Sequence, residues 1–389
     1  IIGVGEVGYH IAKVLAIEGV EVVVIDFDEK KLQRIINELD VATIVGEAGS
    51  YEILKEVGAQ ETDFLIAATN SDEQNMIACL IAKSIPNIKR KIARIRNLNY
   101  VTNEVLLGKD NLDINPAISP EQEAAKAILR LMEVPLASDV EEFEDGAVKV
   151  IGLKIPKDSE VIGRRLMDLG IKFLVGVIIR DEEVYIPSGA SVIRGGDIIY
   201  LPVVSNNISE VINALGGVAK PLKRVMIAGG GRIGFSVAKE LEKKKHVTIK
   251  LIEKDVERCE FLTRNLDKTI VFQGEAPDQE LLKEENISDM DVFTAVTNNE
   301  EVNIMSSLLA KKMGAKKIIT LVNRTDYIPL AHNLGIEAVL SPRLITASTI
   351  LRYIRKGDIL SLTSIANGKA EIIEARVGEH SVIIGKPLQ

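Results

Sequence analysis

Two glycine-rich segments carry the most informative chemistry in this sequence. One begins at Gly3, the other at Gly229, and both fit the pattern G-x-G-x-x-G. Between a strand and a helix, such a loop presents backbone N–H groups at the helix N-terminus, where they favour a phosphate. An acid follows each loop at the expected distance of about 20 residues, Asp26 in the first case and Glu253 in the second. A carboxylate there accepts hydrogen bonds from ribose hydroxyls and repels a 2′-phosphate, so the pattern predicts two nucleotide sites that disfavour NADP.

Each glycine of the pattern has its own expected role. The first allows a tight turn, the second lets the backbone approach a pyrophosphate, and the third lets the helix pack close to the strand. The loops differ at one position, because Glu6 of the first corresponds to Arg232 of the second. Arg232 can add a charge-assisted bond to a phosphate, whereas Glu6 must point away or be neutralised. The candidate loop residues are Gly3, Val4, Gly5, Glu6, Val7 and Gly8, and then Gly229, Gly231, Arg232, Ile233 and Gly234.

A further positive charge is expected at the first site. Arg94 should end a strand that faces the ligand, where it offsets Glu6, and Thr320 is expected at the same position in the second half. The alternative for Arg94 is a surface arginine. For each loop, the alternative is a Rossmann-like fold that has lost its ligand.

The repeat extends well beyond the loops. The paired segments are Val45-Gly46-Glu47-Ala48 with Gln273-Gly274-Glu275-Ala276, the run from Thr69-Asn70 to Asn75 with that from Thr297-Asn298 to Asn303, Ser119-Pro120 with Ser341-Pro342, and Val161 to Arg164 with Ile383 to Lys386. The chain therefore has an A-B-A-B layout. The last B is expected to be cut short at Gln389, and Ile1-Ile2 to be the end of a strand whose beginning is missing.

The elements around the first loop alternate between strand and helix. Buried, β-branched runs predict strands at 20–26, 42–45, 64–68 and 91–95, and helical spacing predicts helices at 28–39, 50–57 and 72–84, with Ser50 as an N-cap. Such alternation predicts a doubly wound parallel sheet of the Rossmann type. A helix at 120–132 should leave that sheet.

A smaller α+β module is expected to follow. The acidic stretch from Val134 to Glu144, which contains Pro135, is interpreted as a boundary. Beyond it we expect strands at 148–155 and 174–179, a helix at 159–169, a turn at 181–183 and final strands bracketed by 185–189 and 195–201. A linker at 216–221 and a strand at 224–228 should follow. The predicted domains are two Rossmann-like domains at 1–134 and 219–353, and two small α+β modules at 135–218 and 354–389.

Composition excludes several classes of function. The net charge of −8 and the absence of Trp argue against a nucleic-acid partner. The two isolated cysteines suit a reducing compartment. No apolar run reaches the 18 residues of a membrane span, and no signal peptide is recognised, so a cytoplasmic protein is expected. The four histidines have no metal-ligand spacing, and no catalytic motif is found. Two nucleotide sites without a reaction suggest sensing.

On these residues the chain resembles the TrkA family, the cytoplasmic regulatory subunits of Trk-type potassium uptake systems. Members alternate two nucleotide-binding RCK/KTN domains with two small RCK C-terminal domains. The resemblance covers nearly the whole chain, and its marks are Gly-Val-Gly-Glu-Val-Gly at 3–8, Ala-Thr-Asn-Ser-Asp-Glu at 68–73, Ala-Arg-Ile-Arg-Asn at 93–97 and Gly-Gly-Asp-Ile-Ile-Tyr at 195–200. The departures are Glu6 and the short last module.

The resemblance implies a regulator that binds NAD(H), with ATP or ADP as further ligands. It implies a ring, formed by a dimer with four nucleotide units or by a tetramer, at the inner face of the cell membrane. There it would gate an integral-membrane potassium-translocating subunit of the TrkH or TrkG type. The implied contacts, carried to both halves, are the two loops, Asp26, Thr69, Asn70, Arg94, Glu253, Thr297 and Asn298.

Two other classes of function stay open at this point. An NAD-dependent oxidoreductase would use the same loops, but it also needs an acid/base and an anion clamp, which the small modules do not offer. A nucleotide-binding scaffold without a role in transport is the other alternative. Titration with NAD, NADH, ADP and ATP would separate the ligand hypotheses.

Overall fold

The computed structural model describes the chain except at residues 58–60, 86, 135, 144–145, 171–172, 182, 218–219, 355–358, 366–369, 376, 379–380 and 386–389. The chain divides into two compact units. Unit 1 comprises Ile1–Glu123, Pro342–Leu360 and Ala375–Gln389, and unit 2 comprises Ala124–Ser341 and Ser361–Glu374. Each unit contains one of the two glycine-rich loops.

Unit 1 contains a parallel sheet built in two wings. One wing pairs β1 (Val23–Asp26) with β2 (Ala42–Val45), and the other is β3 (Phe64–Ala67), β4 (Arg90–Arg94) and β5 (Ala117–Ile118). Ile2 bridges in parallel to both Ile25 and Ala67, so the wings meet at the start of the chain. The predicted doubly wound arrangement is confirmed, and it places the first loop where the strand order reverses.

Three helices of this sheet begin within one residue of the predicted positions: α2 (Glu29–Glu38), α3 (Tyr51–Glu56) and α4 (Asp72–Lys83). Helix α1 (Glu6–Ile17) follows the first loop, and the short α5 (Leu98–Val101) and α6 (Glu104–Leu107) were not predicted. Ser50 is the predicted N-cap of α3, since its Oγ accepts from the N–H of Ile53 at 3.4 Å.

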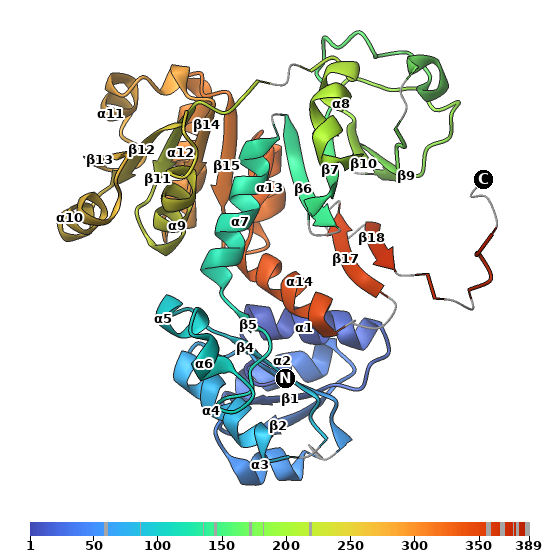
Figure 1. The fold of residues 1–389 in the computed structure, drawn as a ribbon, viewed down its shortest axis with the longest axis vertical. Coiled ribbons are helices and arrows are strands. Elements are labelled where there is room, and N and C mark those ends of the chain that lie inside the picture. The colour runs from blue at the N-terminus through green and yellow to red at the C-terminus, as the bar shows by residue number, and fades with distance from the viewer. Residues whose placement is uncertain are drawn as a thin grey trace. The chain divides into compact units, whose positions relative to one another are not determined.

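Unit 2 repeats this architecture with a longer sheet. Its six strands are parallel and lie in the order β13-β12-β11-β14-β15-β16. Their bounds are β11 (Arg224–Ala228), β12 (Thr248–Glu253), β13 (Thr269–Gln273), β14 (Val292–Ala295), β15 (Lys317–Leu321) and β16 (Ala338–Leu340). The helices are α9 (Arg232–Leu241), α10 (Val256–Asn265), α11 (Gln279–Glu284), α12 (Glu300–Lys312) and α13 (Tyr327–Asn333) (Figure 1). The strand predicted at 224–228 is confirmed.

The small module of unit 2 is an antiparallel sheet. Its strand order is β6-β7-β10-β8-β9. The elements are β6 (Ala137–Phe143), β7 (Val148–Lys154), β8 (Val177–Arg180), β9 (Glu183–Tyr185), β10 (Ile198–Val204) and α8 (Ile208–Ala214), with 3₁₀ turns at Leu166–Leu169 and Ser205–Asn207. A further 3₁₀ turn, Ile287–Asp289, precedes β14 of the six-stranded sheet. A two-stranded sheet, β17 (Ile359–Ile365) and β18 (Ala370–Ala375), follows later in the chain.

The structure adds a strand to one predicted segment of this module and contradicts another prediction. The acidic stretch interpreted as a boundary contains strand β6, in which Val140 and Phe143 are buried on opposite faces and Glu142 pairs with Lys149 at 3.0 Å. The helix predicted at 159–169 is absent, because Gly163 has φ +82° and donates its N–H to Ile193 O instead of continuing a helical ladder. The boundary residue Pro135, and Lys386 of the last repeat pair, lie outside the described residues. The division into four domains stays a prediction.

The helix that follows each sheet belongs to the other unit. Helix α7 (Pro120–Glu133) places Ala125, Ile128 and Leu131 in the core of unit 2. Helix α14 (Pro342–Ile354) places Ala347, Ile350 and Leu351 in the core of unit 1. The prediction that the helix at 120–132 leaves its sheet is confirmed, and the repeat makes the exchange reciprocal.

Equivalent cations hold the ends of these two helices. In unit 1, Arg90 on β4 donates from Nη1 to Tyr353 O of α14 at 2.9 Å. In unit 2, Lys317 on β15 donates from Nζ to Leu131 O of α7 and to Val134 O, the latter at 2.8 Å. In each case a basic side chain therefore donates to the carbonyls at the C-terminal end of a helix.

Candidate nucleotide-binding sites

The fold itself requires the first and third glycines of each loop. A Cβ on Gly3, which has φ +91°, would lie 2.8 Å from the backbone of Thr69, and a Cβ on Gly8 would lie 1.9 Å from Gly3 O. The second loop has the same geometry, with 2.8 Å from Gly229 to Thr297 N and 1.9 Å from Gly234 to Gly229 O. These glycines are explained by backbone packing alone.

The middle glycines have no such explanation. A Cβ on Gly5 or on Gly231 would meet nothing within 4 Å, and neither residue has a positive φ. Both are N-caps without a side-chain hydrogen bond, so the first N–H groups of α1 and α9 face this open space. The open space at each helix N-terminus lets a ligand approach the backbone closely, and this geometry fits a pyrophosphate.

The predicted acids lie beside the loops and bind them. Asp26, 7% exposed, accepts from the N–H of Val4 at 2.7 Å and from that of Asp28 at 2.9 Å. Glu253 accepts from the N–H of Gly230 at 2.7 Å through one oxygen, and through the other from the two residues that follow it. Each carboxylate thus joins the loop to the end of the neighbouring strand, and its remaining lone pairs can accept from ribose hydroxyls.

A buried asparagine, which sequence reasoning did not assign to the site, completes each one. Asn75, fully buried, accepts through Oδ1 from the N–H and the hydroxyl of Thr69, at 2.9 and 2.7 Å. Asn303 does the same for Thr297, at 2.8 and 2.7 Å. These bonds fix the turns after β3 and β14 against the glycine loops. The repetition of this asparagine six residues after each threonine was the available signal.

Arg94 has the environment expected of a ligand-facing arginine. Its Nη1 donates to Thr69 O at 2.8 Å and lies 3.5 Å from Asn70 Oδ1. Its Nε is buried without a hydrogen-bond partner in the described structure. Burial, followed by the charge of nearby Arg96, lowers the pKa of the Arg94 guanidinium. A buried donor without a partner and a cation that gains from an added negative charge both fit a bound phosphate or nucleotide oxygen.

The position predicted to match Arg94 needs correction. Asn75 donates to Arg94 O at 2.7 Å, and Asn303 donates to Leu321 O at 3.0 Å, so Leu321 is the equivalent residue. Thr320 is fully buried one residue earlier and donates to Ser307 Oγ at 2.6 Å. The second site therefore has an apolar side chain where the first has a cation.

The remaining predicted residues divide between packing and the rim. Val4 and Val7 are buried in the core of unit 1, and Ile233 is half-buried. The exposed rim residues are Glu6 and Asn70 in the first site and Arg232 and Asn298 in the second. The charge difference between Glu6 and Arg232 thus lies at the mouth of each loop, where a ligand would meet it.

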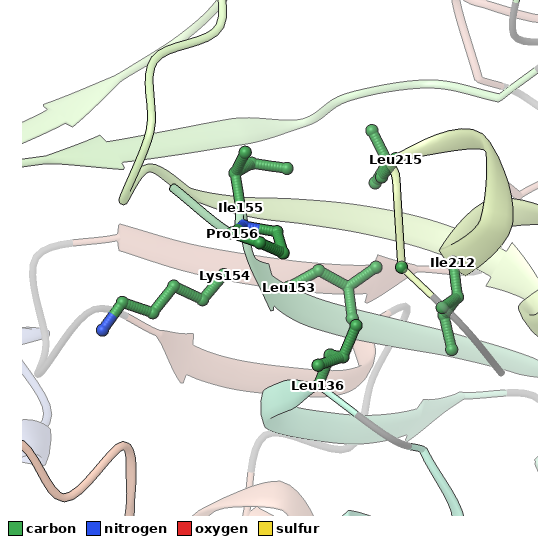
Figure 2. A pocket seen from close by; sticks show the side chains of 8 residues that line it. Leu136, Leu153, Lys154, Ile155, Pro156, Ile212 and Leu215 are labelled. Carbon is green, nitrogen blue, oxygen red and sulfur yellow. The ribbon is translucent and has the colours of Figure 1, made fainter. Parts of the chain in front are cut away.

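Other features of the described chain offer no competing chemistry. No group of three or more His, Cys, Asp or Glu side chains among the described residues has an arrangement that could hold a metal. A pocket in the small module of unit 2 is lined almost wholly by apolar groups such as Leu136 and Leu153 (Figure 2). Its one charged side chain, Lys154, points away from these leucines and pairs with Glu337 at 3.1 Å. No helix in the described part of the chain is both long and apolar enough to span a bilayer.

Comparison with known proteins places these features in a family. The model of the TrkA-N domain matches residues 1–120 and 225–342, which contain the two loops. The Trk system potassium uptake protein TrkA of Halomonas elongata is 39% identical over 381 residues, covering 96% of this chain and 83% of that protein. The Trk system potassium uptake protein trkA homolog 1 of Methanosarcina mazei is 36% identical over 396 residues, covering 100% and 97%.

Solved structures show the same fold at low sequence identity. The GsuK RCK domain matches with a TM-score of 0.65 and 16% identity, over 93% of this chain and 78% of that one. The GsuK channel bound to NAD matches with a TM-score of 0.65 and 15% identity, over 91% and 62%. The human SLO3 gating ring matches with a TM-score of 0.52 and 13% identity, over 87% and 78%.

Proposed function

The chain belongs to the TrkA family of Trk-system potassium uptake proteins, and we propose that it senses nucleotides and gates a separate potassium-translocating membrane subunit. The observation that carries the proposal is the pair of open middle glycines, Gly5 and Gly231, each beside an acid and unexplained by packing. The chain is a regulatory subunit of potassium uptake. None of the relatives and structures named above is an oxidoreductase, and we propose that the chain is not an enzyme.

The ligand of the first site is NAD(H) or ADP. The N–H groups of the first turn of α1 hold its phosphates, Asp26 accepts from its ribose, and the unpartnered Nε of Arg94 donates to it. Among the GsuK structures, which share the fold, one is of the channel bound to NAD and another is of GsuK bound to ADP. A 2′-phosphate would meet the Asp26 carboxylate, so NADP is disfavoured.

The second site prefers ligands with more phosphates. Arg232 lies at its mouth where the first site has Glu6, and a cation gains more from ATP than from NAD. Its contacts also include Glu253, and Thr297 and Asn298 at the turn after β14. The absence of a counterpart to Arg94, with Leu321 in that place, makes the two sites unequal.

Gating follows from differential binding to two shapes of a ring. Two chains supply four Rossmann-like domains, enough for a closed ring of fourfold pseudo-symmetry at the inner face of the membrane. A ligand that favours one ring shape by about 1–3 kcal/mol changes the affinity for the membrane partner by a factor of about 5–150. By linkage, the partner shifts nucleotide affinity by the same factor.

The test is potassium flux in vesicles that contain the membrane subunit, with and without this protein. We expect nucleotide to alter the flux only when the protein is present, and Gly5→Asp to abolish part of the response. Potassium flux that does not change with nucleotide, together with steady NADH consumption by the isolated protein, would refute the regulatory role and favour an oxidoreductase.

A further inference from the structure

The two glycine loops differ in how the protein holds them, and the difference centres on Arg258. This residue lies on α10, three residues after its N-cap Asp255. Its Nε donates to Gly230 O at 2.6 Å, and its Nη2 lies 3.4 Å from Gly231 O. The guanidinium also stacks on Phe261, 4.4 Å from the ring centroid, and lies 5.8 Å from that of Phe235.

The peptide groups of Gly230 are therefore held on both sides. Its N–H donates to Glu253 at 2.7 Å, while its carbonyl accepts from Arg258. Phe235 and Phe261 are themselves in contact, with centroids 5.6 Å apart, and fix the guanidinium plane. A planar donor stacked in this way loses little freedom when it binds, so the bond to the loop is a persistent one.

A glycine at position 230 makes this contact possible. A Cβ there would lie 2.3 Å from Leu262 Cδ1 and 3.2 Å from Glu253 Oε2, so α10 packs directly against the loop backbone. The first loop has Val4 at this position, and its side chain is buried.

The first loop has no side-chain donor that corresponds to Arg258. Lys31, three residues after the N-cap Asp28, is the equivalent of Arg258. Its Nζ pairs with Asp28 at 3.6 Å and lies 5.7 Å from the centroid of Phe27. Among the described residues, no side chain donates to the carbonyl of Val4 or Gly5.

We infer that Arg258 is a positioning residue that keeps the second glycine loop in its phosphate-binding shape before any ligand arrives, whereas the first loop is ordered by its ligand. The inference rests on the proposed nucleotide sites for its functional meaning. Fixing loop residues costs conformational entropy, so a loop that is already fixed binds more tightly. The second site then stays loaded at nucleotide concentrations over which the first site still responds, and the first site is the sensor.

The structural half of this inference is tested without nucleotide. Hydrogen exchange is followed in the full chain at the bonded amides of Gly230 and Val4, after correction for their intrinsic chemical rates. We expect Gly230 to exchange about tenfold more slowly, and Arg258→Ala to remove that difference. Phe261→Leu, which removes only the stacking, should have a smaller effect in the same direction. The matched control Lys31→Ala should leave Val4 unchanged. Equal rates in the unsubstituted protein, or a rate at Gly230 that Arg258→Ala does not change, would overturn the inference.

The functional half uses ADP and adenosine as probes in a Gly5→Asp background, where only the second site binds. Arg258→Ala should weaken the affinity for ADP about tenfold and leave the affinity for adenosine unchanged, because Arg258 holds the part of the site that binds phosphate. Added guanidinium ion at low millimolar concentration should restore part of the ADP affinity. Equal losses for both ligands would mean a general structural role and would overturn the inference. A second site that binds neither probe would refute the proposed nucleotide site there, while the exchange experiment still decides whether Arg258 braces the loop.

Discussion

Substituting Asp26 by alanine should weaken the first nucleotide site and destabilise unit 1 at the same time. The carboxylate is nearly buried and accepts from two backbone N–H groups, at 2.7 and 2.9 Å. Hydrogen bonds to a charged acceptor contribute roughly 1.5–3 kcal/mol each. Because the Asp28 amide is partly solvated, we expect a loss of about 2–4 kcal/mol in the free energy of unfolding. The lost ribose bonds should weaken NADH and ADP by about 1–3 kcal/mol, a factor of about 5–150.

The assay is calorimetric titration in a Gly231→Asp background, so that only the first site reports, with thermal unfolding measured on the same samples. Glu253→Ala is the matched control and should leave the first-site affinity unchanged. Asp26→Asn keeps one acceptor oxygen but removes the charge, so it should improve NADP relative to NADH. Undiminished NADH affinity in Asp26→Ala would refute the assignment of this acid to the ribose. An unchanged NADP to NADH ratio in Asp26→Asn would refute the electrostatic argument.

Three further predictions follow from the geometry. Gly5→Asp and Gly231→Asp should each fold, because their Cβ positions are open, and each should abolish one nucleotide site. Titration of the surviving sites should show a higher preference for ATP over NAD at the second site. Equal preference ratios would contradict the role given to Arg232. Gly8→Ala should destabilise unit 1 by about 2–4 kcal/mol in denaturant unfolding, because its Cβ would lie 1.9 Å from Gly3 O. A decrease of less than about 0.5 kcal/mol in the free energy of unfolding would show that helix α1 can shift to make room. Burial lowers the pKa of Lys317 from 10.5 to about 7. Between these values the unfolded chain binds more protons than the folded chain, so the free energy of unfolding should rise as the pH increases from 7 to 10.5. Lys317→Arg, which matches Arg90 of unit 1, should lack that rise, and the same pH profile in both proteins would contradict the prediction.

The sequence predicted the parts of the site that depend on local backbone geometry. A glycine loop before a helix and an acid after the next strand are short-range patterns; Gly3 and Gly8 have the predicted backbone geometry, and Asp26 lies beside the loop. Residues that act through tertiary contacts were harder. Asn75 reaches Thr69 and Arg94 only because two strands end side by side, and its repeated spacing from the threonine marks it as a candidate without showing these contacts.

The errors have physical causes too. Acidic composition at 134–144 gave no sign of strand β6, in which Glu142 is neutralised across the sheet by Lys149. Helical spacing at 159–169 competed with Gly163, whose positive φ directs the backbone to pair with Ile193 instead. The equivalence of Arg94 and Thr320 was wrong by one residue, because the two repeats differ in length between the glycine loop and this strand. At 159–169, backbone pairing outweighed helical periodicity.

The exchange of α7 and α14 has a consequence for synthesis on the ribosome. The core of unit 1 includes Ala347, Ile350 and Leu351, which emerge long after the rest of that unit has been translated. Until α14 is translated, the apolar surface around Ile11 stays exposed, and a nascent chain in this state is prone to aggregate. A chaperone that holds exposed apolar surface would therefore act during translation. A chain released early, before Pro342, would have a complete second nucleotide domain and an unfinished first one.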